Sequence, residues 1–170
     1  MRNASIRPML PDLPPLPPIE IDPLPYELKL DARPLSQIDL IVIHCTETPT
    51  LDSARDFGER VLYEGSGTGN SGHYYIDRDG STTLYVRPDR VAHHVRGYNP
   101  RSIGIELVNT GRYPHWLAAG SHSMPEPYTE AHVLALLAEV LGHRQARERH
   151  AETGSGGLVH LTVDERDLVE

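Results

Sequence analysis

Residues 38–43, Ile-Asp-Leu-Ile-Val-Ile, form a nearly continuous apolar run that restricts the possible folds more than any other feature of the chain. A strand exposed to water on one face alternates apolar and polar residues. A strand buried on both faces instead has an unbroken apolar sequence, often rich in β-branched residues. The run therefore predicts a central strand in a sheet that is covered on both of its faces.

The rest of the chain alternates between strand and helix patterns. Further strands are predicted at residues 73–77, 82–86, 102–108 and 158–160, the first two as a hairpin with Asp79-Gly80 in its turn. A short helical pattern runs from about residue 52 to 62, and the clearest helix runs from about Thr129, a residue suited to the N-cap, to Arg149. This alternation predicts a single α/β domain with a mixed central β-sheet flanked by helices.

Prolines are concentrated at the start of the chain, with nine of the fifteen in residues 1–34. Proline is unsuited to helix interiors and central strands, so this segment is expected to be extended. Two interpretations stay open: an arm lying against the domain surface, which we favour, and a free linker or partner-binding motif. We therefore divide the chain into a Pro-rich N-terminal arm at residues 1–35 and a domain at residues 36–170.

Charge and composition argue against several classes of protein. A net charge of −8 does not suit a nucleic-acid binder, which needs clustered Lys and Arg. No apolar run approaches the roughly 18 residues that a membrane span requires. A single cysteine, Cys45, cannot form an intramolecular disulfide. Prolines interrupt every candidate signal peptide, so we expect a cytoplasmic protein, although a chain whose signal had been removed would look the same.

Three residues could take part in a metal-dependent site. His44 follows the central strand, and His160 ends a short apolar run near the C-terminus. Imidazoles fixed at the ends of neighbouring strands are good ligands for Zn²⁺, which binds histidine nitrogen at about 2.0–2.1 Å. Glu106 is a carboxylate in an apolar strand, where burial would raise its pKa toward the range of a general base. The alternatives are structural roles for the histidines and an ion pair with Arg101 for Glu106.

The other histidines and the cysteine are expected to lie elsewhere. At most one of His93 and His94 can face the site, because neighbours along a strand point to opposite faces. By the same alternation, Cys45 should point away from whatever His44 binds, as a small core residue. Histidines at other loop or helix positions are expected at the surface: His115, His122, His132, His143 and His150.

Four segments together resemble, in order and spacing, the type 2 N-acetylmuramoyl-L-alanine amidases. This superfamily includes phage lysozyme-type amidases and the peptidoglycan recognition proteins. The segments are residues 41–48 (IVIHCTET), 71–80 (SGHYYIDRDG), 92–99 (AHHVRGYN) and 102–109 (SIGIELVN). One such segment would be weak evidence, but four in order, followed by the long helix and a Val-His pair, are specific. The resemblance covers roughly residues 36–163.

The resemblance implies zinc-dependent hydrolysis of the amide between the lactyl group of N-acetylmuramic acid and L-alanine, in bacterial peptidoglycan or muropeptides. It assigns His44 and His160 as zinc ligands. It also assigns Glu106 to position or deprotonate the zinc-bound water. Three further residues of the matching segments are expected to contact substrate: Tyr74, His94 and Asn99.

One part of the family pattern is absent. The third zinc ligand and a catalytic lysine belong, in the family, to a Lys-x-Asp-Pro-Gly-like segment further downstream, whereas the single lysine here is Lys29. We therefore expect the domain to lack its C-terminal end as a piece of a longer enzyme, rather than to have lost its activity. Two other classes stay open: a module that binds peptidoglycan fragments without cutting them, and an interaction domain acting through its proline-rich arm.

Overall fold

A six-stranded sheet forms the centre of the molecule, in the strand order β1-β4-β3-β5-β2-β6. It is seen in a computed structural model that describes residues 18–114, 126–151 and 160–163, with side chains up to residue 143. The strands are β1 (Glu20–Ile21), β2 (Leu40–Cys45), β3 (Tyr74–Ile76), β4 (Thr82–Leu84), β5 (Ser102–Leu107) and β6 (His160–Val163). The helices in the described ranges are α1 (Leu51–Gly58) and α2 (Glu130–Ala151), with short 3₁₀ turns at Glu27–Lys29, Leu35–Gln37 and Asn99–Arg101.

The sheet is mixed, as the sequence predicts. Strands β3, β5, β2 and β6 run parallel to one another, whereas β4 pairs antiparallel with β3 through the predicted hairpin. Strand β1 pairs with β4 at one edge. All six residues of β2 are buried, which confirms the expected central strand covered on both faces.

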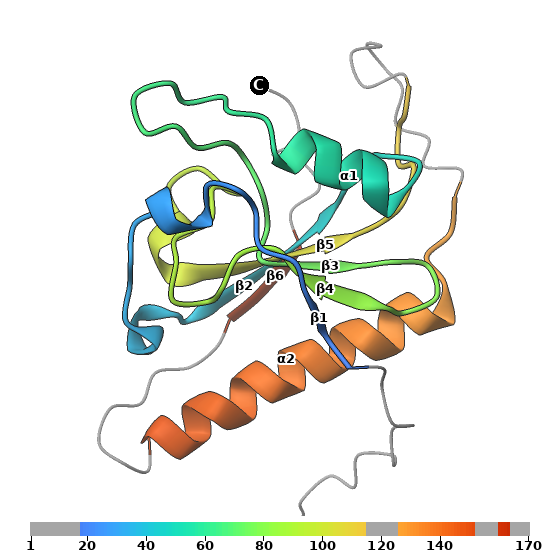
Figure 1. Ribbon diagram of the computed structural model, residues 1–170. Helices are drawn as coiled ribbons and strands as arrows, with labels where there is room; N and C mark the ends of the chain where they lie inside the picture. The colour runs from blue at the N-terminus through green and yellow to red at the C-terminus, as the bar shows by residue number, and fades with distance from the viewer. Residues whose placement is uncertain (1–17, 115–125, 152–159, 164–170) are drawn as a thin grey trace, which may run out of the picture.

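The two faces of the sheet have different covers. Helix α2 lies along one face, while α1 and the N-terminal segment lie on the other side (Figure 1). The core beneath α2 contains the isoleucines of the central strands, including Ile41, Ile43, Ile103 and Ile105, packed with Ala135. Neither described helix is long and apolar enough to cross a membrane.

The N-terminal segment from residue 18 onward is part of the domain. Leu24, Tyr26 and Leu30 are at most 3% exposed and belong to a second apolar cluster on the α1 side of the sheet. The Tyr26 hydroxyl donates a hydrogen bond to the Gly58 carbonyl at the end of α1. Packing therefore begins well before the expected boundary at residue 35. The prediction of an extended arm for residues 1–17 lies outside the described residues.

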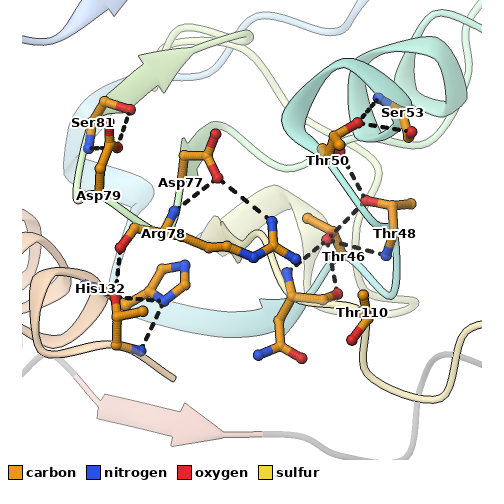
Figure 2. A network of polar contacts seen from close by, with 12 residues as sticks. Thr46, Thr48, Thr50, Ser53, Asp77, Arg78, Asp79, Ser81, Thr110 and His132 are labelled. Atoms are coloured by element: carbon orange, nitrogen blue, oxygen red, sulfur yellow. Dashed lines mark hydrogen bonds and ion pairs between the residues drawn. The ribbon is translucent and has the colours of Figure 1, made fainter. Parts of the chain in front are cut away.

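The predicted bounds of the helices agree with the structure except at the end of α1. The Thr50 hydroxyl accepts a hydrogen bond from the Ser53 amide and caps α1 (Figure 2). Helix α1 stops at Gly58, and Val61 and Leu62 are 53% and 55% exposed beyond it. The predicted extension of this helix to residue 62 is therefore wrong. Apolar spacing alone did not distinguish a buried stripe from an exposed loop.

Helix α2 begins with a reciprocal cap. The Thr129 hydroxyl accepts from the His132 amide at 3.1 Å, and His132 Nδ1 accepts from the Thr129 amide at 3.2 Å. This arrangement places the imidazole where a capping box has Glu or Gln. Thr129 also donates to the carbonyl of Arg78, so the cap ties α2 to the β3–β4 turn. His132 is 0% exposed, which corrects its expected place at the surface.

Replacing Ile103 with Ala should destabilise the domain by about 2–5 kcal/mol, the usual cost of truncating a fully buried aliphatic side chain. Ile103 is 0% exposed and pairs in register with Ile41 at the centre of the sheet. Urea unfolding is the measurement, and Ile21→Ala is the control, because Ile21 is 68% exposed on edge strand β1. Equal losses in the two variants would contradict the assignment of the core.

Replacing Glu126 with Gln should remove a pH-dependent part of the stability. Hydrogen bonds from Arg78 first, and from Thr110, lower the pKa of the Glu126 carboxyl to about 2 from 4.5. Because the folded-state pKa is the lower one, the carboxylate stabilises the fold above about pH 4.5 and loses this effect as the pH falls toward about 2. The difference in urea midpoint between wild type and variant should therefore shrink over that interval. Asp56→Asn, at an exposed position of α1, is the matched control substitution.

Candidate active site

Parallel pairing of the central strands places three polar side chains in one row. Glu106 on β5 is paired in register with His44 on β2 and with Tyr75 on β3. Neighbouring strands lie about 4.7–4.9 Å apart, and residues paired in register share a face of the sheet. The row lies on the face opposite α2, because the alternating residues Ile43 and Ile105 face the helix.

Glu106 is a carboxylate without a polar partner in the described part of the chain. No hydrogen bond or ion pair to its oxygens is found there, and the expected alternative partner, Arg101, pairs with Asp39 at 2.5 Å instead. Burial raises the pKa of Glu106, and the charge of nearby His44 acts in the opposite direction. A Cβ atom on Gly72 would lie 2.7 Å from Glu106 Cγ, so glycine at this position makes room for the carboxylate.

His44 contacts a second imidazole. Its Nε2 lies 2.9 Å from His94 Nδ1, and the two rings meet edge to face. His44 is 4% exposed at the end of β2, whereas His94 lies on the segment between β4 and β5. His93 contacts a different ring, that of Tyr63, with 5.3 Å between the ring centroids. Residues 93 and 94 lie outside the strands, so the alternation expected for a strand does not apply to this pair.

The hydrogen bonds around His94 define which nitrogen carries its proton. The Ser102 hydroxyl donates to the Tyr98 carbonyl at 2.9 Å, so it can only accept from His94 Nε2, which lies 3.0 Å away. Burial lowers the pKa of His94 well below its usual range, which favours the neutral ring. Neutral His94 therefore accepts at Nδ1, and His44 donates from Nε2. The lone pair of neutral His44 is then at Nδ1.

Close approach to β5 fixes the position of the His94 ring. A Cβ atom on Gly104 would lie 2.6 Å from His94 Cγ, so a side chain there would displace the imidazole. Asn99 holds the backbone of the same segment, because its side-chain oxygen accepts from the amides of His94 and Val95 at 3.0 and 2.8 Å. The glycine of the SIGIE segment is therefore required by packing against a histidine from another segment.

Two buried residues behind His94 were not identified from the sequence. His73 is 0% exposed, and its Nδ1 accepts from the Gly104 amide at 3.0 Å. Arg33 is 5% exposed, and its Nη2 lies 2.8 Å from His73 Nε2. Burial, followed by the charge of Arg33, lowers the pKa of His73 to about 3. His73 lies in residues 71–80, one of the segments that resemble the amidases, so the sequence could have indicated it as a site residue. Arg33 is one of fifteen arginines, and nothing in the sequence distinguishes it from the others.

The register of β6 does not bring His160 to His44. His160 begins β6 and pairs with Leu40, and the strand continues to Val163 beside Ile43. Four residues of strand therefore separate the backbones of the two histidines, which is about 13 Å. The expected approach of the two side chains to 3–4 Å is not supported. The reason is that the predicted strand at residues 158–160 starts at His160 instead of ending there.

The three residues expected to contact substrate have different positions. His94 lies in the site, in contact with His44. Asn99 uses its side-chain oxygen to support the segment that carries His94. Tyr74 is buried on the opposite face, with its ring 5.3 Å from that of His143, so its predicted contact with substrate does not fit. The alternation of side chains along β3 puts Tyr75 on the face of Glu106 instead.

The described side chains do not by themselves form a zinc site. They contain no group of three His, Cys, Asp or Glu residues placed to hold one ion. His44 can supply one ligand, since no hydrogen bond to its Nδ1 is found in the described ranges. The contact of 2.9 Å between His44 and His94 is a hydrogen-bond distance, shorter than the roughly 3.4 Å between two nitrogens bound tetrahedrally at 2.1 Å.

The comparisons with known proteins agree with the geometry. Residues 34–155 match a family model described as N-acetylmuramoyl-L-alanine amidase. A search of curated proteins found no match. Among solved structures, the amidase LysC from Clostridium intestinale is 19% identical, with a TM-score of 0.58 over 86% of this chain and 82% of that one.

Two other solved structures have the same fold. Drosophila peptidoglycan recognition protein SA is 18% identical, with a TM-score of 0.57 over 86% of this chain and 80% of that one. An AmpD derivative is 24% identical, with a TM-score of 0.53 over 94% of this chain and 90% of that one. The family match covers most of the sequence, including β2, β5 and α2. The chain therefore belongs to the N-acetylmuramoyl-L-alanine amidase family.

Proposed function

We propose that this protein hydrolyses the amide bond between N-acetylmuramic acid and L-alanine in peptidoglycan or muropeptides. The observation that carries the proposal is the pairing of Glu106 with His44 on adjacent central strands, with the carboxylate desolvated and without a polar partner among the described residues. A carboxylate in such surroundings is costly unless it has a task, because burial penalises its charged form. Membership of the amidase family gives that task its chemical class.

Glu106 is the proposed general base. It accepts a proton from the attacking water while the water oxygen bonds to the lactyl carbonyl carbon. The same proton then passes to the L-alanine nitrogen as the carbon–nitrogen bond breaks. The products are the lactyl carboxylic acid, which gives its remaining proton to solvent, and a peptide with a free amino terminus. Burial raises the pKa of the Glu106 carboxyl, which makes the carboxylate a stronger base.

Zinc dependence is a further part of the proposal. It is supported by the family resemblance and by the free lone pair that the hydrogen bonds leave on His44 Nδ1. The remaining ligands would have to come from outside the described side chains. His160 remains a candidate by resemblance, and the register of β6 weighs against it.

A second candidate function is binding of peptidoglycan fragments without hydrolysis. The similarity in fold to a Drosophila peptidoglycan recognition protein favours it. The position of the single lysine also favours it, because the enzymes of the family that the sequence resembles use a catalytic lysine. Lys29 is instead exposed, and its Nζ lies 3.5 Å from the Gly67 carbonyl. The superfamily that the sequence resembles contains both amidases and peptidoglycan recognition proteins. A measurement of peptidoglycan hydrolysis is therefore what distinguishes the two functions.

Replacing Glu106 with Gln should abolish release of L-alanine-started peptides from purified peptidoglycan while leaving binding to the insoluble material intact. The matched control is Glu139→Gln, because burial also raises the pKa of Glu139, which lies on α2 at the other face. Turnover by the Glu106 variant at the wild-type rate would remove Glu106 from the mechanism. Wild-type protein that binds but releases no peptide would favour the second function.

The same substitution should stabilise the fold at neutral pH. Because burial raises the folded-state pKa of Glu106 above its unfolded value, the wild-type fold is destabilised as the pH rises past about 4.5. Glu106→Gln should therefore have a higher unfolding temperature at pH 7, with a difference that shrinks toward pH 4. A variant that is less stable than wild type at pH 7 would show that the carboxylate has a favourable partner.

Replacing His44 with Ala should weaken zinc binding by more than the about 10–100-fold that loss of an outer-shell partner usually costs. The measurement is zinc content per chain after dialysis against buffered zinc. His93→Ala is the control, since His93 contacts the ring of Tyr63 and no contact with His44 is found in the described part of the chain. Equal zinc content in wild type and His44→Ala would exclude His44 as a ligand.

A further inference from the structure

Arg33 lies just ahead of the residues that match the family, and it is buried beside the candidate site. Its guanidinium reaches both ends of the segment that carries His94. Nε donates to the Pro88 carbonyl at 2.8 Å, at the start of this segment. Nη1 donates to the carbonyls of Asn99 and Ser102 at 2.8 and 2.7 Å, at its end.

Asn99 and Ser102, whose carbonyls accept from Arg33 at the end of this segment, also contact His94 through their side chains. The Asn99 side chain accepts from the His94 amide, and the Ser102 hydroxyl contacts His94 Nε2 at 3.0 Å. Arg33 therefore binds the backbone of two residues whose side chains fix the backbone and the ring of one imidazole. That imidazole in turn contacts His44.

A second set of contacts joins the same two segments. The Arg33 amide donates to the Asp89 carbonyl, and the Val91 amide donates to the Asp31 carbonyl. Arg90 donates back to the carbonyl of Leu30 at 3.1 Å. The backbone of residues 30–33 thus runs beside residues 87–91, so the guanidinium enters from a fixed direction.

The charge on Arg33 is not neutralised by a carboxylate within ion-pair distance in the described part of the chain. Burial lowers its pKa to about 10. A buried cation held by carbonyl oxygens and one imidazole, without a carboxylate beside it, is an expensive way to fill space. The fork of five N–H donors is, however, the side chain that can bind carbonyls from two ends of one loop together.

We propose that Arg33 is a positioning residue of the active site, which holds the 88–102 segment so that His94 meets His44. The expected effect of Arg33 on kcat rests on the proposed amidase function. Its expected effect on the position of His94 does not. It makes the segment ahead of the family match a working part of the site. A surface arm would have no such role.

The test compares Arg33→Met and Arg33→Lys with Arg55→Met. Arg55 is the matched control because it also ties the N-terminal segment to the domain, through the carbonyls of Asp22 and Pro23. It does so at α1, outside the contacts of His94. One measurement is the ¹H–¹⁵N NMR spectrum of the His94 and His44 imidazoles in metal-free protein. The other is kcat and KM for peptide release.

Arg33→Met should shift the imidazole signals of both histidines and lower kcat by about 10²-fold, the effect of a misplacement of about 1 Å in an active site. The change in KM should be smaller. Arg33→Lys should give an intermediate result, because one ammonium cannot reproduce the fork. Arg55→Met should leave the signals in place even if it lowers the unfolding temperature.

Imidazole signals that stay at their wild-type positions in folded Arg33→Met would overturn the proposal. If Arg33→Met does not fold, Arg33→Lys decides by the same signals. Equal shifts in Arg55→Met would also overturn it, since they would indicate general loosening. The NMR measurement needs no substrate, so shifted signals in a protein without amidase activity would uphold the positioning role and refute the proposed function instead.

Discussion

The parallel pairing of β2 with β5 is the interaction on which the rest of the site depends. Six consecutive residues of each strand are in register, and the fifth pair is His44 with Glu106. The four pairs before it set that register, because a slip by one residue would move Ile41 and Ile43 from the core beneath α2 to the face of Glu106. The same hydrogen bonds that build the centre of the sheet therefore set the distance between the imidazole and the carboxylate.

The remaining parts of the site are fixed by close packing against that pair of strands. Gly104 admits the ring of His94, and Gly72 admits the carboxylate of Glu106. Both glycines are needed because another chain segment approaches closely, and neither is explained by turn geometry. His73 fills the space behind His94 and binds the Gly104 amide, so the backbone of β5 is engaged from that side as well.

The sequence predicted the elements with a strong local signal. The apolar run gave β2, Asp79-Gly80 gave the hairpin, and Thr129 gave the start of α2. It predicted strands at the positions of His44 and Glu106, and the two residues are paired in register on β2 and β5. It did not distinguish Tyr74 from Tyr75, since neighbouring tyrosines in a strand look alike until the register with β5 is known.

Non-local pairing limited the rest of the prediction. The place of His160 depended on where β6 begins beside β2, and nothing within residues 158–160 encodes that offset. Arg33 acts through backbone carbonyls about 55–69 positions away in the chain, and carbonyls carry no sequence signature. Its role was therefore visible only after folding had brought the two segments together.

The order of the elements along the chain also has a consequence for synthesis. Strands β2, β3, β4 and β5 leave the ribosome before α2, yet α2 covers the face formed by their isoleucines. A nascent chain that has paired these strands carries that apolar face uncovered until some forty further residues have been translated, at about 5–20 residues per second. During those few seconds the growing domain presents a binding surface for chaperones, or for other nascent chains, that the finished protein no longer has.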